Sequence, residues 1–120
     1  MPIELNTKDG KVTITTEVIA QIAGGTAVEC YGIVGMASKN QLRDGFQEII
    51  GKDNYSRGIV VRQENNELHI DMYIIVSYGT RISEVAHNVQ SQVKYKLNQS
   101  LGLEIDSINI YIHGVRVSND

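Results

Sequence analysis

The amino-acid sequence predicts a two-layer α+β domain, in which two main helices pack on one face of a mixed or mostly antiparallel sheet of about four to five strands. Three patterns indicate this class. Residues 58–64 and 67–78 alternate apolar and polar side chains around Asn65-Asn66, residues 80–100 carry apolar side chains at helical spacing, and residues 104–117 alternate again. We therefore expect a single domain over residues 1–120 in the order β-α-β-(short α)-β-β-α-β.

The N-terminal segment begins with residues 1–10, which we interpret as a loose lead-in with a turn at Asp9-Gly10. Residues 11–14 alternate and predict a short strand. Thr15 or Thr16 is then suited to cap a helix, because its hydroxyl can accept a backbone N–H bond. One face of this helix carries small and apolar residues, namely Ile19, Ala23, Thr26, Ala27 and Cys30. Gly24-Gly25 in its middle indicates either a kink or a close approach to the sheet.

The middle of the chain shows the least regular pattern. Gly32 and Gly35 enclose two apolar residues, which predicts an exit from the helix into a short strand. The same G-x-x-G spacing occurs in RNA-binding loops that hold a nucleic-acid backbone. Residues 41–50 have the apolar spacing of a short helix. Basic residues outnumber acidic ones here, which gives a candidate basic loop of Lys39, Arg43, Lys52 and Arg57. A contact for an acidic partner and an ordinary solvated loop both fit it.

The C-terminal half carries the clearest elements. Asn65-Asn66 tolerates positive φ and predicts a tight hairpin turn. Thr80 or Ser83 is suited to cap the following helix, and Gly102 is the expected left-handed residue that ends it. Its apolar stripe consists of Ile82, Val85, Ala86, Val89, Val93, Leu97 and Leu101. A helix between two strands allows them to be parallel through a right-handed crossover, and Gly114 predicts a bulge in the last strand. The strand order stays open.

Composition and charge argue against several classes of function. A net charge of −3 argues against a protein that binds a nucleic-acid backbone, because such proteins carry a basic surplus. No apolar run approaches the roughly 18 residues of a membrane-spanning helix, and no signal-peptide core is present at the N-terminus. We therefore expect a cytoplasmic protein without direct membrane insertion. Cys30 is the single cysteine, which excludes an internal disulfide and predicts a small buried thiol rather than a reactive one.

The candidate interaction face lies on the side of the sheet away from the helices. If both long strands share one sheet, they present there His69, Asp71, Tyr73, Ile75, Asn109, Tyr111 and His113. The side chains expected to make contacts are His69, Tyr73, Ile75, Tyr111 and His113. Aromatic and apolar side chains on an uncovered sheet resemble a protein contact surface. Ordinary half-exposed strand residues and a stacking platform for single-stranded nucleic acid are the alternatives.

Catalytic and metal-binding patterns are missing from the sequence. His69, His87 and His113 are far apart along the chain, and no cysteine cluster or closely spaced His/carboxylate pair accompanies them. The sequence contains no P-loop, Rossmann glycine pattern, nucleophile elbow or zinc-helix motif. We therefore expect a non-enzymatic protein with no cofactor and no metal.

Several segments carry a resemblance to a known family. They are residues 10–14 with 18–23, Tyr31-Gly-Ile-Val-Gly-Met36, residues 58–61, residues 71–79 with their "V-x-YG" ending, residues 82–86 with 93 onward, and Ile108-Asn-Ile-Tyr-Ile-His-Gly-Val115. Together they cover nearly the whole chain. In these segments the chain resembles the alkaline shock protein family, the bacterial envelope stress response proteins found mainly in Gram-positive organisms. Tyr31 stands where proline is common in that family.

The resemblance implies a small, cytoplasmic, non-enzymatic protein that supports cell-envelope homeostasis. It also implies a protein partner, since some relatives are held at the inner side of the membrane by a separate small membrane-anchored protein. The leading hypothesis is an interaction or scaffold protein that forms a homo-oligomer and docks to a protein partner through the face with Tyr73 and Tyr111, without binding DNA. An accessory subunit of a soluble enzyme and a small RNA-binding module are the alternatives.

Overall fold

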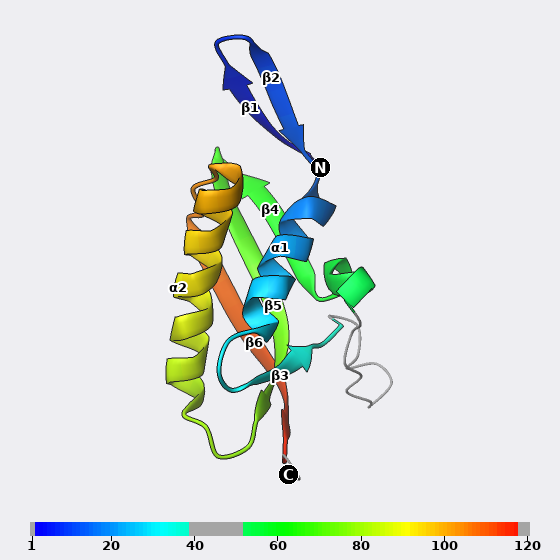
Figure 1. The fold of residues 1–120 in the computed structure, drawn as a ribbon, viewed down its shortest axis with the longest axis vertical. Helices are drawn as coiled ribbons and strands as arrows, with labels where there is room; N and C mark the ends of the chain where they lie inside the picture. Colours follow the sequence, from blue (N-terminus) through cyan, green and yellow to red (C-terminus); the bar gives the residue numbers. More distant parts are fainter. Residues whose placement is uncertain (1, 39–51, 118–120) are drawn as a thin grey trace.

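The computed structural model describes residues 2–38 and 52–117. Its elements are β1 (Ile3–Thr7), β2 (Gly10–Ile14), α1 (Thr16–Val28), β3 (Ile33–Met36), the 3-10 helix η2 (Lys52–Arg57), β4 (Ile59–Glu64), β5 (Glu67–Ser77), α2 (Ile82–Leu101) and β6 (Ser107–Arg116). Figure 1 shows α1 and α2 side by side over one face of the main sheet. The predicted α+β class is confirmed, while the short helix predicted over residues 41–50 lies outside the described residues.

Strand β5 is the centre of the main sheet, which is mixed as predicted. β6 runs parallel to β5 along one side, from the pair His69–Ser107 to the pair Ser77–Arg116. On the other side β4 and β3 follow each other end to end, both antiparallel to β5. The parallel pair is joined through α2, so the predicted crossover helix is confirmed. Asn65 and Asn66 form the β4–β5 turn at φ 52° and 65°, as their tolerance of positive φ predicts.

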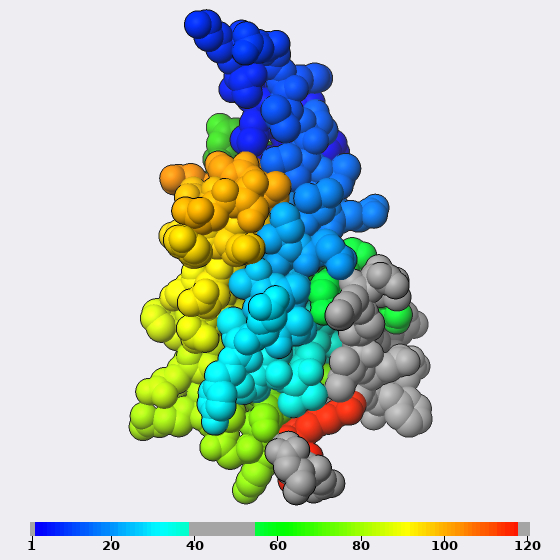
Figure 2. All heavy atoms as spheres, in the orientation of Figure 1, coloured from blue at the N-terminus to red at the C-terminus, as the bar shows by residue number. Residues whose placement is uncertain are grey.

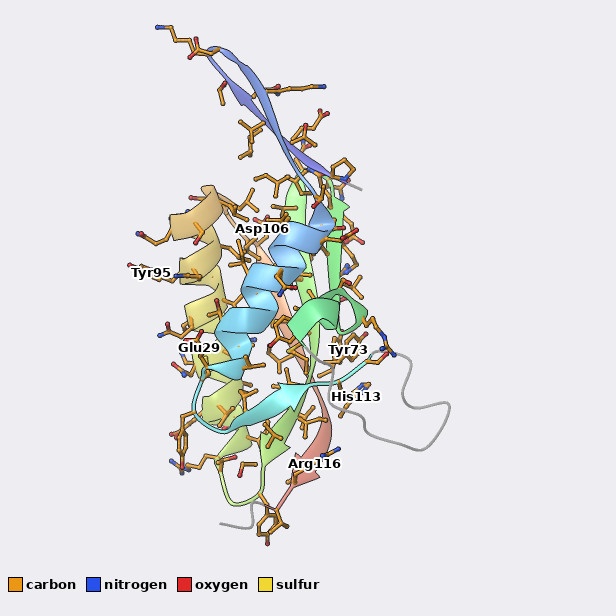
Figure 3. All side chains as sticks on the ribbon, turned by 45° about the vertical axis from the view of Figure 1, so that its right-hand side comes forward. Glu29, Tyr73, Tyr95, Asp106, His113 and Arg116 are labelled. Carbon is orange, nitrogen blue, oxygen red and sulfur yellow. The ribbon has the colours of Figure 1, made fainter. Side chains whose placement is uncertain are left out.

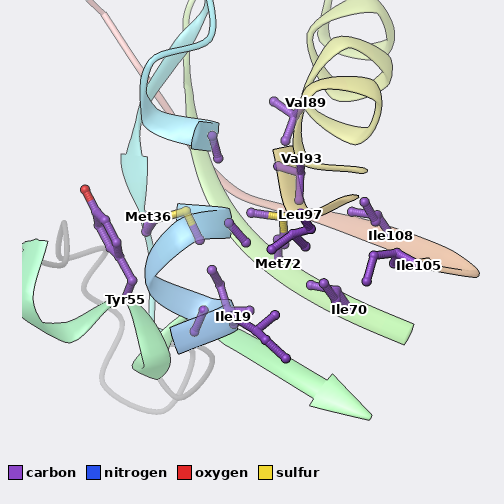
Figure 4. Close-up of a cluster of buried hydrophobic side chains, with 14 of the residues drawn as sticks. Ile19, Met36, Tyr55, Ile70, Met72, Val89, Val93, Leu97, Ile105 and Ile108 are labelled. Carbon is purple, nitrogen blue, oxygen red and sulfur yellow. The ribbon is translucent and has the colours of Figure 1, made fainter. Parts of the chain in front are cut away.

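The hydrophobic core fills the space between the two helices and the sheet (Figure 4). α2 contributes four buried side chains at successive four-residue steps, Val85, Val89, Val93 and Leu97. α1 contributes the large side chain of Ile19 together with Ala20, Ala23 and Ala27, and the three alanines are small enough to let the helix lie close to the sheet. Burial of each large side chain stabilises the fold by about 1.5–3 kcal/mol. The core therefore fixes which face of the sheet is covered and which is left to the surroundings.

The glycine pair in α1 does not kink the helix, which runs unbroken from Thr16 to Val28. A Cβ atom at Gly24 would lie 2.6 Å from two ring atoms of Tyr55 in η2. The predicted close approach at the glycine pair is thus confirmed for Gly24, but the neighbour is η2 and not the sheet. Gly25 has no heavy atom within 4 Å of such a Cβ position and does not need to be glycine for space.

The G-x-x-G segment is a packed turn in this structure. Gly32 adopts a φ of +87°, which favours glycine, and a Cβ atom there would lie 2.6 Å from Cγ2 of Val85. Its carbonyl accepts a hydrogen bond from the backbone N–H of Ser77. These contacts explain Gly32 by the packing of the turn against α2 and β5.

The N-terminal ten residues are not a loose lead-in as expected. Strand β1 pairs antiparallel with β2, from Ile3 opposite Ile14 to Thr7 opposite Gly10. Ile3 and Leu5 alternate with polar residues, so β1 has one apolar face. In the hairpin this face lies beside Val12 and Ile14 of β2. Figures 1 and 2 show this hairpin projecting as an arm beyond the body of the molecule.

The cap of α2 also differs from the prediction. Arg81 occupies the N-cap position without a side-chain cap hydrogen bond. The guanidinium of Arg81 instead forms an ion pair with Glu84 in the first turn. Thr80 does not cap the helix, because its hydroxyl donates to the carbonyl of Ser77. At the other end Gly102 is left-handed at φ 70°, as predicted.

Candidate functional site

The outer face of the sheet is the face of β5 turned away from α1 and α2. Successive side chains of a strand point to opposite sides, so the odd-numbered residues of β5 lie on it. His69, Asp71, Tyr73 and Ser77 are all partly exposed, whereas the even-numbered residues from Leu68 to Val76 are buried. The predicted division of β5 into a covered and an uncovered face is therefore largely confirmed.

An outer aromatic cluster, defined by Tyr73, Tyr111 and His113, occupies one end of this face. Tyr73 and Tyr111 are directly opposite each other in the β5–β6 register, and their rings stack at 5.0 Å with an interplanar angle of 17°. His113 meets Tyr73 edge-on at 4.8 Å. Figure 3 shows Tyr73 and His113 near each other on this side of the sheet. Tyr111 is 44% exposed, so the stack presents ring surface outward.

A polar network occupies the neighbouring part of the face and joins three strands. The guanidinium of Arg62 on β4 donates two hydrogen bonds to the carboxylate of Asp71 on β5, Nε–Oδ2 at 3.0 Å and Nη2–Oδ1 at 3.1 Å. Asn109 on β6 donates to Oδ1 of Asp71 at 2.9 Å. Arg62 also reaches Glu64 through Nη1 at 3.1 Å. The network ties the register of β4, β5 and β6 together.

The charge state of Asp71 follows from these partners. Burial by itself raises the pKa of a carboxyl, but the hydrogen bonds from Arg62 and Asn109 outweigh it and hold the pKa of Asp71 below its ordinary value. The pKa of Tyr73 is raised, first by burial and then by the nearby Asp71. Near neutral pH the face therefore carries an ionised Asp71 paired with Arg62, beside a protonated Tyr73.

The two histidines of the candidate face differ in their surroundings. The imidazole Nδ1 of His69 lies 2.6 Å from the hydroxyl of Ser107, and its Nε2 lies 3.4 Å from Glu67. Both nitrogens of His69 are thus engaged at the β4–β5 end of the sheet. His113 has a buried Nδ1 without a hydrogen-bond partner among the described residues. The histidine beside the tyrosines is therefore the one whose ring is less satisfied.

Ile75 does not belong to the exposed part of the face, so its prediction as a contact residue is wrong. Its side chain points to the outer side by alternation, yet it is completely buried. In the register Ile75 lies between Gly35 of β3 and Gly114 of β6, where both neighbouring strands shift register. The predicted bulge at Gly114 is thereby confirmed. Alternation gave the direction of Ile75, but only the folded chain shows that this end of the sheet is covered.

The candidate basic loop is described only in part. Lys39 and Arg43 lie outside the described residues, and Lys52 and Arg57 begin and end η2. The side chain of Arg57 is exposed. Whether these four residues form a contact for an acidic partner stays a prediction.

Alternation placed Asp71 and Asn109 on this face without predicting them as contact residues, and it did not place Arg62 there at all. Arg62 counts only as one more base in the sequence, because its partner is nine residues away across the hairpin. The usable signal was the Asn65-Asn66 turn, which sets the β4–β5 register and places the two side chains on neighbouring strands.

The described residues also bear on whether the chain has a metal site, a reactive thiol or a membrane-spanning helix. Among residues 2–38 and 52–117, no group of three His, Cys, Asp or Glu side chains is placed to hold a metal ion. Burial, together with the charge of Glu29, raises the pKa of the Cys30 thiol, which lies 3.5 Å from the carbonyl of Thr26. A raised pKa keeps the thiol protonated and weakly nucleophilic. No helix of the described part of the chain is long and apolar enough to cross a membrane.

The fold and the face together define a small two-layer α+β protein whose uncovered sheet carries paired charges and stacked tyrosines. The chain belongs to the alkaline shock protein 23 family, which has a cell envelope-related function and whose sequence pattern matches residues 4–117. The resemblance inferred from the sequence is thereby confirmed.

Three relatives illustrate the similarity. The chain is 67% identical to uncharacterized protein YloU of Bacillus subtilis over 119 residues, which covers 99% of each chain. It is 43% identical to uncharacterized protein Spy1614 of Streptococcus pyogenes over 117 residues, covering 98% of this chain and 97% of the relative. It is 36% identical to uncharacterized protein YqhY of Bacillus subtilis over 107 residues, covering 89% and 78%.

Proposed function

We propose that this protein is a non-enzymatic scaffold with a cell envelope-related role, which self-associates and docks to a protein partner near the membrane. The docking surface is the outer face of the sheet, made by Tyr73, Tyr111 and His113 with Arg62 and Asp71 beside them. The carrying observation is the half-exposed Tyr73–Tyr111 stack on a sheet face that no described helix covers.

The chemistry of the face supports a protein partner. Tyrosine and arginine are enriched where protein interfaces form, because each combines a broad contact surface with hydrogen-bonding groups. The tyrosines are held in place by their mutual stacking, and Arg62 is held by Asp71, so little conformational freedom would be lost on binding. Such a rigid and partly polar face suits reversible docking.

The family supports the cellular setting of the proposal. Its function is cell envelope-related, and the resemblance found in the sequence implies a separate membrane-anchored partner for some relatives. In this proposal the partner, rather than this chain, supplies the attachment to the membrane.

Site-specific photo-crosslinking in the native cells tests the docking surface. A photoreactive phenylalanine analogue replaces Tyr111 in one strain and Tyr95 in another, and crosslinked products are identified by mass spectrometry. Tyr95 is the matched control, since it is a tyrosine on α2, away from the outer face (Figure 3), and is 62% exposed against 44% for Tyr111. We expect crosslinks to one other protein from position 111 and none to it from position 95.

The other outcomes separate the alternatives. Equal crosslinking from both positions, or none to another protein from position 111, would refute the docking surface. A soluble enzyme as the crosslinked protein would favour an accessory subunit. Crosslinks to RNA, with binding that weakens steeply as salt increases, would favour an RNA-binding module.

A further inference from the structure

The outer edge of β6 has no strand partner in the described structure, and Gln90 of α2 bonds to one of its carbonyls. β6 pairs with β5 on one side, and no described strand lies on its other side. From Ser107 to Val115 the strand contains no proline and no Lys, Arg, Asp or Glu. Edge strands are usually protected from pairing with other chains by charges or proline, as β4 is by Arg62 and Glu64 on the opposite edge. The unprotected edge therefore suits pairing with another strand.

The register shows which backbone groups point outward. The even-numbered residues of β5 bond toward β6, as the hydrogen bonds at Leu68 and Tyr78 show. In a parallel ladder such a residue bonds to the two neighbours of its partner, so Ile70 engages residues 107 and 109. Ile108, Ile110 and Ile112 consequently direct their N–H and C=O groups away from β5. The side chain of Gln90 confirms this orientation, because its Nε2 donates to the carbonyl of Ile108 at 2.9 Å.

The space beside this edge is partly open. A hollow of about 350 Å³ separates α2 from the first residues of β6, and Gln90, Lys94 and Ile105 line it. The side chains of Ile110 and Ile112 are only partly buried, although they pack against the core. A strand added at this edge would cover the remaining apolar surface of both.

We propose that β6 pairs antiparallel with β6 of a second copy of this chain, with the two-fold axis at Ile110. This inference rests on the proposed function, and it gives the self-association its contact. About that axis Ile110 faces Ile110, Ile108 faces Ile112 and Asn109 faces Tyr111. The isoleucines at 108, 110 and 112 are placed symmetrically about Ile110, so each of them meets an isoleucine of the second copy, and Asn109 meets Tyr111 twice, as a two-fold contact allows. The bulge beyond Ile112 limits the paired segment to the first part of β6.

Charge complementarity selects the second copy and its direction. Exposed Glu104 precedes β6 and exposed Arg116 ends it, while the carboxylate of Asp106 between them accepts a hydrogen bond from the backbone N–H of Leu68. Antiparallel pairing brings the acidic end of one copy toward Arg116 of the other, twice in each dimer, while a parallel arrangement would bring like charges together. The pairing also joins both outer faces into one continuous sheet, with the two outer aromatic clusters on the same side.

The test is a proline that removes only outward hydrogen bonds. Ile110→Pro deletes the outward N–H of residue 110 and leaves the bonds of residues 109 and 111 to β5 intact. Ile110→Ala is the matched control, because it shortens the same side chain but keeps the N–H. Sedimentation equilibrium of the full chain should show dimers for the wild type and Ile110→Ala. For Ile110→Pro the dissociation constant should rise on the order of tenfold to a hundredfold, since both central hydrogen bonds are lost.

Amide hydrogen exchange of the wild type provides a second readout that does not depend on the proline variant folding. The N–H groups of Ile110 and Ile112 should become more protected as the protein concentration rises. A monomeric wild type, equal dimer masses for both variants, or outward amides that stay unprotected in an oligomer would overturn the proposal. Pairing of this edge with the β1–β2 arm would appear instead as association that Ile110→Pro and deletion of residues 2–14 both abolish.

The two experiments test the β6 edge contact and the docking function independently. If Ile110→Pro is monomeric and position 111 still crosslinks another protein, the edge assignment and the docking surface both stand. If the mass change occurs but no other protein is crosslinked, the docking function fails and the edge contact remains.

Discussion

The inner and outer faces of strand β5 carry side chains of opposite chemistry, although both faces belong to the same 11-residue strand. On the inner face Ile70, Met72, Ile74 and Val76 are completely buried against the helices. On the outer face Asp71 and Tyr73 are partly exposed, and each is fixed by side chains from the neighbouring strands. Side chains of the inner face stabilise the fold through burial, whereas polar side chains of the outer face hold one another in fixed orientations.

This difference indicates that stability alone does not explain the outer face. A half-buried ion pair recovers much of the free energy that its desolvation costs, but it rarely exceeds an apolar replacement in stability. A sheet that served only to hold the core would tolerate simpler outward residues. The ordered array of Arg62, Asp71, Tyr73 and Tyr111 therefore supports the docking surface proposed above.

The largest expected effect comes from the inner face. Met72→Ala should lower the free energy of unfolding by about 3 kcal/mol, because it removes a completely buried side chain and leaves a cavity. Urea denaturation followed by circular dichroism measures this change. A loss under about 1 kcal/mol would mean that the inner face does not dominate stability.

A smaller effect is expected at the centre of the outer face. Asp71→Asn should cost about 1 kcal/mol at neutral pH, since it weakens the hydrogen bonds from Arg62 and Asn109 at a site that solvent still screens in part. Thermal unfolding of both proteins across a pH series gives the comparison. Asp71→Ala in the same series would show whether any effect needs the charge or only the side chain.

The pH dependence of that difference has a definite sign. The pKa of Asp71 is lowered in the folded protein, so its contribution is present above the unfolded-state pKa of about 4 and disappears as the pH falls through the folded-state pKa. The stability gap between wild type and Asp71→Asn should therefore narrow on acidification below about pH 4. A gap that widens there would show that the ion pair is not the source.

The aromatic stack should contribute less than the ion-pair network. Tyr111→Ala removes a ring that is 44% exposed and stacked on Tyr73, which should cost about 0.5–1 kcal/mol. Chemical denaturation measures the change, and Tyr95→Ala on α2 is the control. If Tyr111→Ala were as damaging as Met72→Ala, the stack would be a structural element rather than a docking surface.

The smallest effect is expected on the β1–β2 arm. Lys11 and Glu4 form an ion pair at 3.4 Å with both side chains more than half exposed. Lys11→Ala should change the free energy of unfolding by less than about 0.5 kcal/mol, because water and salt screen such a pair. Comparison with Asp71→Asn at low and high salt shows how much burial adds to the same chemistry. A larger loss for the arm variant would contradict this ranking.

Much of the candidate site was predictable, and its errors have identifiable causes. Alternation along β5 and β6 places Tyr73, Tyr111 and His113 on one face, because the direction of a strand side chain depends only on its position. The same rule placed Ile75 there and could not show its burial. Arg62 was missed because its role comes from Asp71 on the next strand, and the two residues can be paired only through the register that the Asn65-Asn66 turn sets.

By itself the sequence determined the two main helices, the long strands and the directions of most of their side chains. The Asn65-Asn66 turn, the α2 stripe and the glycine end at Gly102 all follow from local backbone preferences and periodicity, which act within a few residues. Only the tertiary structure decided that β1 forms an arm, that Ile75 is buried, and that no described strand pairs with the outer edge of β6. These features depend on which strands become neighbours and in what register, and that is fixed only when distant segments pack on one core.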